Sequence, residues 1–318
     1  MHAPRLVAKQ VMPASVVALL VVVNLIWAGS AVATKTALTD IPSLILAFAR
    51  FSVSAVLLYG LALWRGVDLR VARSDWAAFW RFGLLGLCLT YLFVYAGIHR
   101  TSATVSSLLM SSEPVFLTVL SYLILHERIS PIRIVGVSMG LVGVYLIVED
   151  GWVAHGLNGS AMGDLMIAAG LLCESTSVII GKGLVGKYPP ISVITYQMAI
   201  GAISLAPFAA IQFFQVVHHG HPLHVSPATF WSIAYLVLPC TVIGYMVWFT
   251  LLETRGPGEM APFIFIQPIM GAVLGYVIRH DLVTVATAAG GFLIVAGIGA
   301  ITVARESTKE PTVISEIV

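Results

Sequence analysis

Four charged residues stand out in the long apolar stretches of this sequence: Arg50, Glu113, Glu174 and, nearer the end of its segment, Lys182. A charged side chain at the centre of a membrane-spanning helix costs about 2.5–3.5 kcal/mol on insertion scales, so each needs a partner or a watery cavity. Arg50 offers a planar fork of donors that suits a carboxylate. We therefore predict that Arg50 either holds a substrate carboxylate or forms a structural ion pair with Glu113 or Glu174.

The two acidic residues have different surroundings. Glu113 precedes Pro114, and a proline inside a helix removes one backbone hydrogen bond and can free a carbonyl to face a cavity. A buried carboxyl there is a candidate proton carrier, with pairing to Arg50 or to a hydroxyl as the alternative. Glu174 is followed by Ser175, Thr176 and Ser177, a polar cluster that predicts a cavity lining.

Aromatic side chains form a second group at helical spacing. Tyr91 and Tyr95 are four residues apart, and Tyr245 and Trp248 are three apart, so each pair shares one helix face. Aromatic rings combine apolar area with a polar tip, which suits an amphipathic or aromatic substrate. The alternative is the aromatic belt at the membrane interface. Because these four residues lie well inside their segments, we favour the cavity.

The elements that must hold these residues are predicted to be membrane helices. Of 318 residues, 58% are hydrophobic and only 10% are charged, too few charges to cover a water-facing surface. A helix needs about 20 apolar residues to cross the hydrocarbon core. The fold class is therefore an all-α membrane protein with ten transmembrane helices. The predicted segments are 13–33, 43–64, 80–98, 103–125, 132–149, 161–181, 190–216, 228–252, 257–278 and 283–303.

Positive charge in the loops predicts the orientation. If the N-terminus is cytoplasmic, 13 lysines and arginines fall inside and 3 fall outside. We predict an integral protein of the cell (inner) membrane with both termini cytoplasmic, and a disordered cytoplasmic tail over 305–318. The alternative for the first segment is a signal peptide cleaved after Ala31–Val32–Ala33. Its length and its place in the repeat favour a retained helix.

The two halves of the chain resemble each other. A shift of 154 residues places Glu113–Pro114 on Gln267–Pro268, and a shift of 147 places Arg50 on Gln197. Each half holds five predicted helices, an odd number, so the halves must enter the membrane in opposite senses. Such inverted repeats are typical of secondary transporters. We predict repeats over 1–150 and 151–304.

Several motifs resemble one known family. They are Asn24-Leu-Ile-Trp27-Ala-Gly-Ser30, Thr101-Ser102-Ala103, Glu113-Pro114-Val115-Phe116, Leu125-His126-Glu127-Arg128, the glycines Gly136, Gly140 and Gly143, and Gln267-Pro268. Over nearly the whole chain the sequence is similar to the EamA type of the drug/metabolite transporter superfamily. Arg279-His280-Asp281 departs from the Gly-Glu pair that the family often has there. The resemblance implies a transporter of amino acids, other metabolites or drugs, with export as the direction.

The function predicted from all this is a secondary-active exporter of small amphipathic metabolites such as amino acids, working by alternating access, with proton coupling as an option. An importer of sugars or nucleotide precursors and a non-transporting membrane sensor or partner protein are the alternatives; an intramembrane enzyme is disfavoured, because the histidines lie in loops or tails. The predicted substrate-binding residues are Asn24, Trp27, Arg50, Tyr91, Tyr95, Glu113, Glu174, Gln197, Tyr245, Trp248 and Gln267.

Other features predict no further chemistry. The sequence has no Gly-x-x-x-x-Gly-Lys-Ser/Thr loop for ATP, and its net charge of +2 implies no nucleic-acid partner. Membrane lipid and a small-molecule substrate are the predicted partners, with no cofactor, metal or catalytic residue. Cys88, Cys173 and Cys240 are interpreted as buried apolar residues, and the histidines at 218, 219, 221 and 224 as a solvated loop. Glycine pairs such as Gly136 and Gly140 indicate helix packing within the chain or a homodimer.

Overall fold

A computed structural model describes residues 12–100, 109–110, 112–126, 130–155, 161–218, 225–267, 269–270, 273 and 285–303. All regular structure in these ranges is helical. In the first half the helices are α1 (Ala14–Ala37), α2 (Ser43–Trp64), η1 (Arg73–Asp75), α3 (Trp76–Gly83), η2 (Leu84–Leu89), α4 (Thr90–Ile98), α6 (Glu113–Leu125) and α7 (Pro131–His155).

The second half contains a similar series. Its helices are α8 (Ala161–Val185), α9 (Pro190–His218), α10 (Pro227–Tyr235), η3 (Leu236–Ile243), α11 (Gly244–Thr254), α12 (Pro257–Met260), η4 (Ala261–Phe265) and α14 (Val285–Val303). Six helices of the described ranges are long and apolar enough to cross a membrane, at 14–34, 43–64, 73–98, 161–185, 190–218 and 227–254. The predicted segment 132–149 lies in α7, of which only Pro131–Gly143 is found as an apolar helix, too short to count among the six. The predicted segments 103–125, 257–278 and 283–303 fall partly outside the described ranges, so the count of ten stays a prediction.

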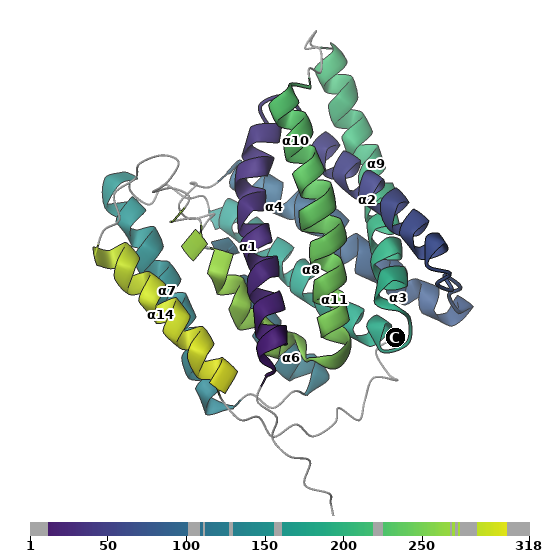
Figure 1. Ribbon diagram of the computed structural model, residues 1–318. Coiled ribbons are helices and arrows are strands. Elements are labelled where there is room, and N and C mark those ends of the chain that lie inside the picture. Colours follow the sequence, from purple (N-terminus) through teal and green to yellow (C-terminus); the bar gives the residue numbers. More distant parts are fainter. Residues whose placement is uncertain are drawn as a thin grey trace, which may run out of the picture.

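Helices from the two halves interleave around a common core. In Figure 1, α1 runs alongside α10 and α11, while α2, α3 and α9 lie together on the other side of the molecule. The largest buried side chains include Phe51 of α2, Phe82 of α3 and Phe249 of α11, which belong to one apolar cluster. A smaller cluster joins α1 and α2 to α10 and η3. The first-half helices α1 and α2 are therefore fastened to η3 of the second half.

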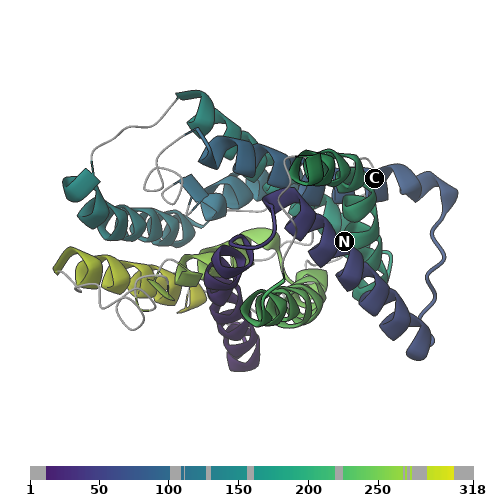
Figure 2. The same ribbon diagram turned by 90° about the horizontal axis from the view of Figure 1, so that it is seen from above.

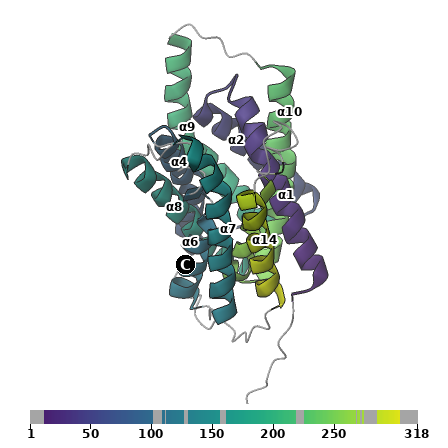
Figure 3. The same ribbon diagram turned by 90° about the vertical axis from the view of Figure 1, so that its left-hand side faces the viewer.

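The helices α7 and α14 form a separate pair. They lie side by side at one edge of the molecule (Figures 2 and 3). Glycines allow the close approach, because a Cβ on Gly143 would lie 2.5 Å from the Gly290 carbonyl and one on Gly297 would lie 2.6 Å from the Gly136 carbonyl. Gly140 likewise packs on the ring of Phe265. Packing within the chain is therefore the role that these contacts give to Gly136 and Gly140.

Two of the long helices contain a π-helical turn. The turn η2 lies between α3 and α4, and η3 lies between α10 and α11. In each, a threonine hydroxyl donates to the carbonyl five residues earlier: Thr90 to Leu85 at 2.7 Å and Thr241 to Leu236 at 2.8 Å. Pro239 contributes to the irregularity of η3, because it has no backbone N–H to donate. Such turns often occur at functional sites.

Candidate functional site

Arg50 lies in the middle of α2, and its side chain points into the protein. The residue is only 8% exposed. Its Nε donates to Thr241 Oγ1 at 2.8 Å, and one terminal nitrogen donates to the Tyr91 hydroxyl at 3.3 Å. None of the carboxylates in the described ranges hydrogen-bonds or ion-pairs with it at close range. The predicted alternative of a close structural ion pair with Glu113 or Glu174 is thus absent from this part of the chain.

The π-helical turn η3 also fixes a residue of α1. In η3 the N–H of Gly244 points to the carbonyl of Pro239, five residues earlier. The Cys240 carbonyl accepts a 2.9 Å hydrogen bond from Trp27 Nε1. Gly244 leaves the room for this indole, since a Cβ there would lie 2.7 Å from Trp27 Nε1. One irregular turn therefore holds both Trp27 and Arg50, which come from different helices.

The predicted aromatic residues form two groups of ring contacts. Trp27 makes an edge contact with Tyr245, with ring centroids 5.8 Å apart, and packs on Trp248 at 5.3 Å. Tyr91 and Tyr95 meet edge to face at 5.4 Å. The predicted aromatic groups are therefore real contacts in the structure. The interface-belt alternative fits poorly for Trp248, which is only 4% exposed within the protein.

Of the two predicted carboxyls, Glu174 lies within electrostatic range of Arg50, without a hydrogen bond to it. Glu174 of α8 interacts electrostatically with Arg50 and with Glu113. Tyr245 of α11 lies within electrostatic range of both carboxyls and of Arg50. Electrostatic interactions therefore run from Arg50 of α2 to Glu174 of α8, and from Glu174 to Glu113 of α6. The expectation for Pro114 is wrong, because α6 begins at Glu113 and Pro114 occupies its first turn, where a missing N–H breaks no helical hydrogen bond.

The remaining predicted residues fall in two places. Asn24 is fully buried, donates to the Leu20 carbonyl at 2.8 Å, and its Oδ1 accepts from Gln267 Nε2 at 3.2 Å. This joins α1 to the segment after η4. Gln197 is 3% exposed and donates to Ser177 Oγ at 3.4 Å, packing against Gly86 of η2. Gln197 therefore contacts η2 and α8, whereas Arg50 donates its hydrogen bond to a residue of η3.

Thr241 is the residue that the sequence predictions missed. It is fully buried and makes the shorter of the two hydrogen bonds to Arg50. A signal for it exists in the repeat, because Thr241 stands 151 positions after Thr90 and both follow similar apolar stretches. Neither threonine is charged or aromatic, so a search for groups that carry chemistry passes over both.

Within the described ranges, no group of three or more His, Cys, Asp or Glu residues could hold a metal ion. Of the four clustered histidines only His218 falls in those ranges, at the end of α9; positions 219, 221 and 224 lie outside them. Gly271 and Gly275, which have the same spacing as Gly136 and Gly140 and carry the same prediction of helix packing, also lie outside those ranges. The candidate site therefore consists of the buried Arg50 guanidinium, the carboxyls of Glu113 and Glu174, and the aromatic side chains described above.

A family model for the EamA-like transporter family matches this chain twice, over residues 14–149 and 161–303. The chain belongs to the EamA-like transporter family. Relatives from Archaeoglobus fulgidus and Bacillus subtilis are named as transporters, not as enzymes. One, an uncharacterized transporter of Archaeoglobus fulgidus, is 29% identical over 281 residues, covering 88% of this chain and 94% of the relative.

Two further comparisons bear on this EamA-like chain. A probable amino-acid metabolite efflux pump of Escherichia coli (strain K12) is 23% identical over 289 residues, covering 89% of this chain and 92% of the relative. A solved crystal structure with 20% sequence identity superposes with a TM-score of 0.75, covering 91% of this chain and 97% of that one. The second similarity supports the fold alone. Together with the apolar helices, membership of the family makes this an integral membrane transporter protein.

Proposed function

We propose that this chain is a secondary-active exporter of small amphipathic metabolites such as amino acids. In this proposal residues 1–150 and 151–304 form two inverted five-helix repeats that rock against each other around a central site. Two observations support the repeat: the family model matches each half separately, and each half has a π-helical turn with the same threonine hydrogen bond. The excess of positive charge in alternate loops supports cytoplasmic termini and the inner membrane.

The observation that carries the proposal is the state of Arg50. Of the five N–H donors of a guanidinium, two are bonded here, both to hydroxyl groups. The guanidinium carbon also lies 5.3 Å from the centre of the Phe51 ring, but neither the ring nor the two hydroxyls carries a negative charge. A buried cation without a bonded anion is costly, unless a ligand supplies the opposite charge. The free donors therefore support an anionic group on the substrate, and a carboxylate is the anion that matches the guanidinium fork.

The aromatic groups support an amphipathic substrate. Trp27, Tyr245 and Trp248 provide a broad ring surface on the α1 side, and Tyr91 and Tyr95 provide another on α4. A substrate with a carboxylate at Arg50 would rest its apolar part on such rings. The name of the Escherichia coli relative, a probable amino-acid metabolite efflux pump, agrees with this chemistry and with export.

A flux experiment tests the proposal. The purified protein is reconstituted in liposomes, and the exchange of radiolabelled leucine and phenylalanine is followed in both directions, with and without a proton gradient. We expect saturable exchange that falls roughly 10- to 100-fold in Arg50→Ala, because losing a charge-assisted hydrogen bond costs about 1.5–3 kcal/mol.

The direction of net flux separates the exporter from the alternatives. Net accumulation into inside-out vesicles is the result for an exporter, and net uptake in the opposite orientation would favour the importer of sugars or nucleotide precursors. If no amino acid, sugar or nucleotide precursor crosses in either direction, the transport function is rejected. The non-transporting sensor or partner protein would then be the better description.

A further inference from the structure

Two hydrogen bonds in series hold the Arg50 guanidinium at its Nε atom. Thr241 has one hydroxyl proton, and it points to the Leu236 carbonyl at 2.8 Å. The lone pairs of the same oxygen are therefore left to accept the Arg50 Nε–H at 2.8 Å. Hydrogen bonds in series polarise and strengthen each other in a buried site. The direction of each bond in this chain is thus set by the carbonyl at its end.

The wide turn η3 makes this arrangement possible. In a regular α-helix a threonine hydroxyl bonds the carbonyl three or four residues earlier. In η3 Thr241 instead reaches back five residues to Leu236. The position of its oxygen therefore depends on the π-helical turn, and so does the direction from which it holds Arg50.

Most N–H groups at the opposite end of the guanidinium have no partner within the described part of the chain. The second hydrogen bond of Arg50, to the Tyr91 hydroxyl, takes one N–H of a terminal nitrogen. Three of the five N–H donors have no hydrogen-bond partner among residues that the structure describes. Both bonded groups are neutral hydroxyls, so neither cancels the positive charge. A planar anion could therefore bind at the terminal nitrogens while Nε stays anchored.

We propose that Thr241 is a positioning residue, which holds Arg50 so that its terminal N–H groups receive the carboxylate of the transported molecule. This inference rests on the proposed transport function and adds the group that makes the site select carboxylates. An arginine that is not anchored would lose rotamer freedom when the substrate binds, and this loss weakens binding. Anchoring at Nε removes part of that cost before the substrate arrives.

The other half of the chain supplies a matched control. Thr90 makes the same bond to the carbonyl five residues earlier, at 2.7 Å, in the π-helical turn η2. Its oxygen then lies 3.3 Å from the Gly170 carbonyl of α8, with no arginine against it. Any effect of a threonine substitution on the π-helical turn itself should appear at both positions. An effect on Arg50 should appear only at Thr241.

The experiment compares two probes that differ in one group, phenylalanine and phenylalaninamide. Their dissociation constants are measured on the full-length protein in detergent by tryptophan fluorescence and by calorimetry. The variants are Thr241→Val, Thr241→Ser, Thr90→Val and Thr90→Ser. We expect Thr241→Val to weaken phenylalanine binding about tenfold and to leave the amide nearly unchanged, with Thr241→Ser restoring the wild-type value. Both Thr90 variants should keep the wild-type preference for the carboxylate.

Two results would overturn the inference. One is an equal loss for both probes in Thr241→Val and Thr90→Val, which would show a structural role of the π-helical turns. The other is a wild-type protein that does not prefer the carboxylate to the amide. Because the readout is binding, it is separate from the flux assay: selective binding without transport would reject the proposed function and leave Thr241 as a positioning residue.

Discussion

The Nε of Arg50 donates a 2.8 Å hydrogen bond to Oγ1 of Thr241, across 191 positions of the chain. Arg50 belongs to α2 and Thr241 to η3, so the bond joins the first half of the molecule to the second. Trp27 makes a second bond of this kind, to the Cys240 carbonyl at 2.9 Å. Both partners of η3 are residues whose types predict substrate contact. The proposed site is thus held by the same turn that connects the halves.

Replacing Arg50 with lysine should separate charge from geometry. Lysine keeps the positive charge but has no Nε–H to donate to Thr241 and no planar fork for a carboxylate. We expect folding to be kept and carboxylate affinity to fall roughly tenfold, measured as the dissociation constant for phenylalanine. Arg50→Gln, which removes the charge, should lose more. Equal affinity in Arg50→Lys and the wild type would contradict recognition by the guanidinium fork.

Adding a methyl group at Gly244 should displace Trp27. A Cβ there would lie 2.7 Å from Trp27 Nε1, too close for the indole to keep its bond to Cys240. We expect Gly244→Ala to lose about 1–3 kcal/mol of stability, as overpacking usually does. The measurement is thermal unfolding in detergent, together with phenylalanine affinity.

The control for that substitution is Gly60→Ala on α2. A Cβ on Gly60 would meet no atom within 4 Å, so this variant should unfold at or slightly above the wild-type temperature. The double variant Gly244→Ala with Trp27→Phe should recover part of the lost stability, because the smaller ring leaves room for the methyl group. Additive losses in the double variant would show that the two sites do not interact.

The two carboxyls should have unequal roles in coupling. Glu174 interacts electrostatically with Arg50, whereas Glu113 interacts with Glu174. We expect Glu113→Gln to abolish the part of transport that a proton gradient drives while exchange without a gradient continues. Glu174→Gln should also change phenylalanine affinity, since it removes a carboxyl that interacts electrostatically with Arg50. Proton-driven flux that survives in both variants would exclude these carboxyls as the proton carriers.

The Asp40 carboxylate should make the stability of the fold depend on pH in the acidic range. Its carboxylate accepts from the Ser226 backbone N–H at 2.9 Å and from Thr229 Oγ1 at 2.6 Å, tying the turn after α1 to the start of α10. The hydrogen bonds from Ser226 and Thr229 hold the pKa of Asp40 well below its ordinary value of 3.8. The unfolded chain therefore takes up this proton at higher pH than the folded one. The stabilisation is complete well above pH 3.8 and fades as the pH falls below it.

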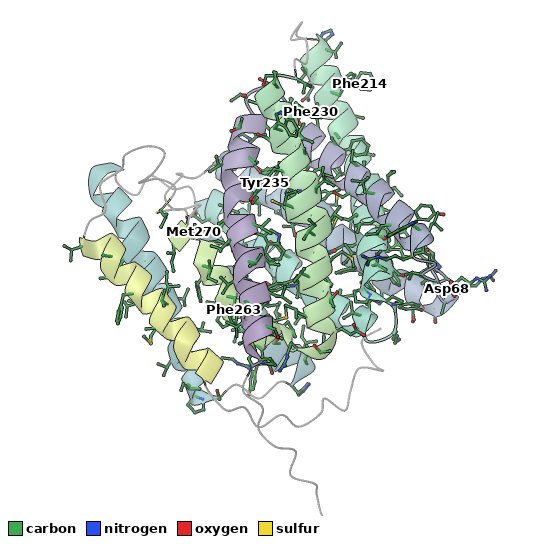
Figure 4. All side chains as sticks on the ribbon, in the orientation of Figure 1. Asp68, Phe214, Phe230, Tyr235, Phe263 and Met270 are labelled. Carbon is green, nitrogen blue, oxygen red and sulfur yellow. The ribbon has the colours of Figure 1, made fainter. Side chains whose placement is uncertain are left out.

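The corresponding measurement is the unfolding temperature in detergent between pH 7 and pH 3. Asp40→Asn should lower it at neutral pH and remove part of its decrease in acid. Asp68→Asn is the control, since among the described residues the Asp68 carboxylate accepts a bond only from the nearby Arg70 N–H, at 2.9 Å. An acid dependence that is identical in Asp40→Asn and the wild type would contradict this role. At the other end of α10, the Tyr235 hydroxyl donates to the Ile26 carbonyl of α1 at 2.9 Å (Figure 4 labels Tyr235), and this bond involves no carboxylate.

Much of the fold follows from the sequence, because a helix in lipid must satisfy its backbone internally and be apolar along its length. That is why the segment predicted at 43–64 is helix α2, Ser43–Trp64, and why the segment at 190–216 falls within α9. The same reasoning singled out Arg50 and Glu174, because charge is rare at this depth. Spacing along one helix was also enough to pair Tyr91 with Tyr95.

Only the tertiary structure decided which distant groups meet. Arg50 has a threonine as its closest partner, and Gln197, its counterpart in the repeat, lies against η2 and α8 instead. The sequence alone marks Pro239 but does not say that a π-helical turn forms around it or that Trp27 bonds the Cys240 carbonyl there. The physical reason is that helical period and hydropathy act within one segment. Hydrogen bonds between segments depend on how the helices pack, which their separate sequences do not specify.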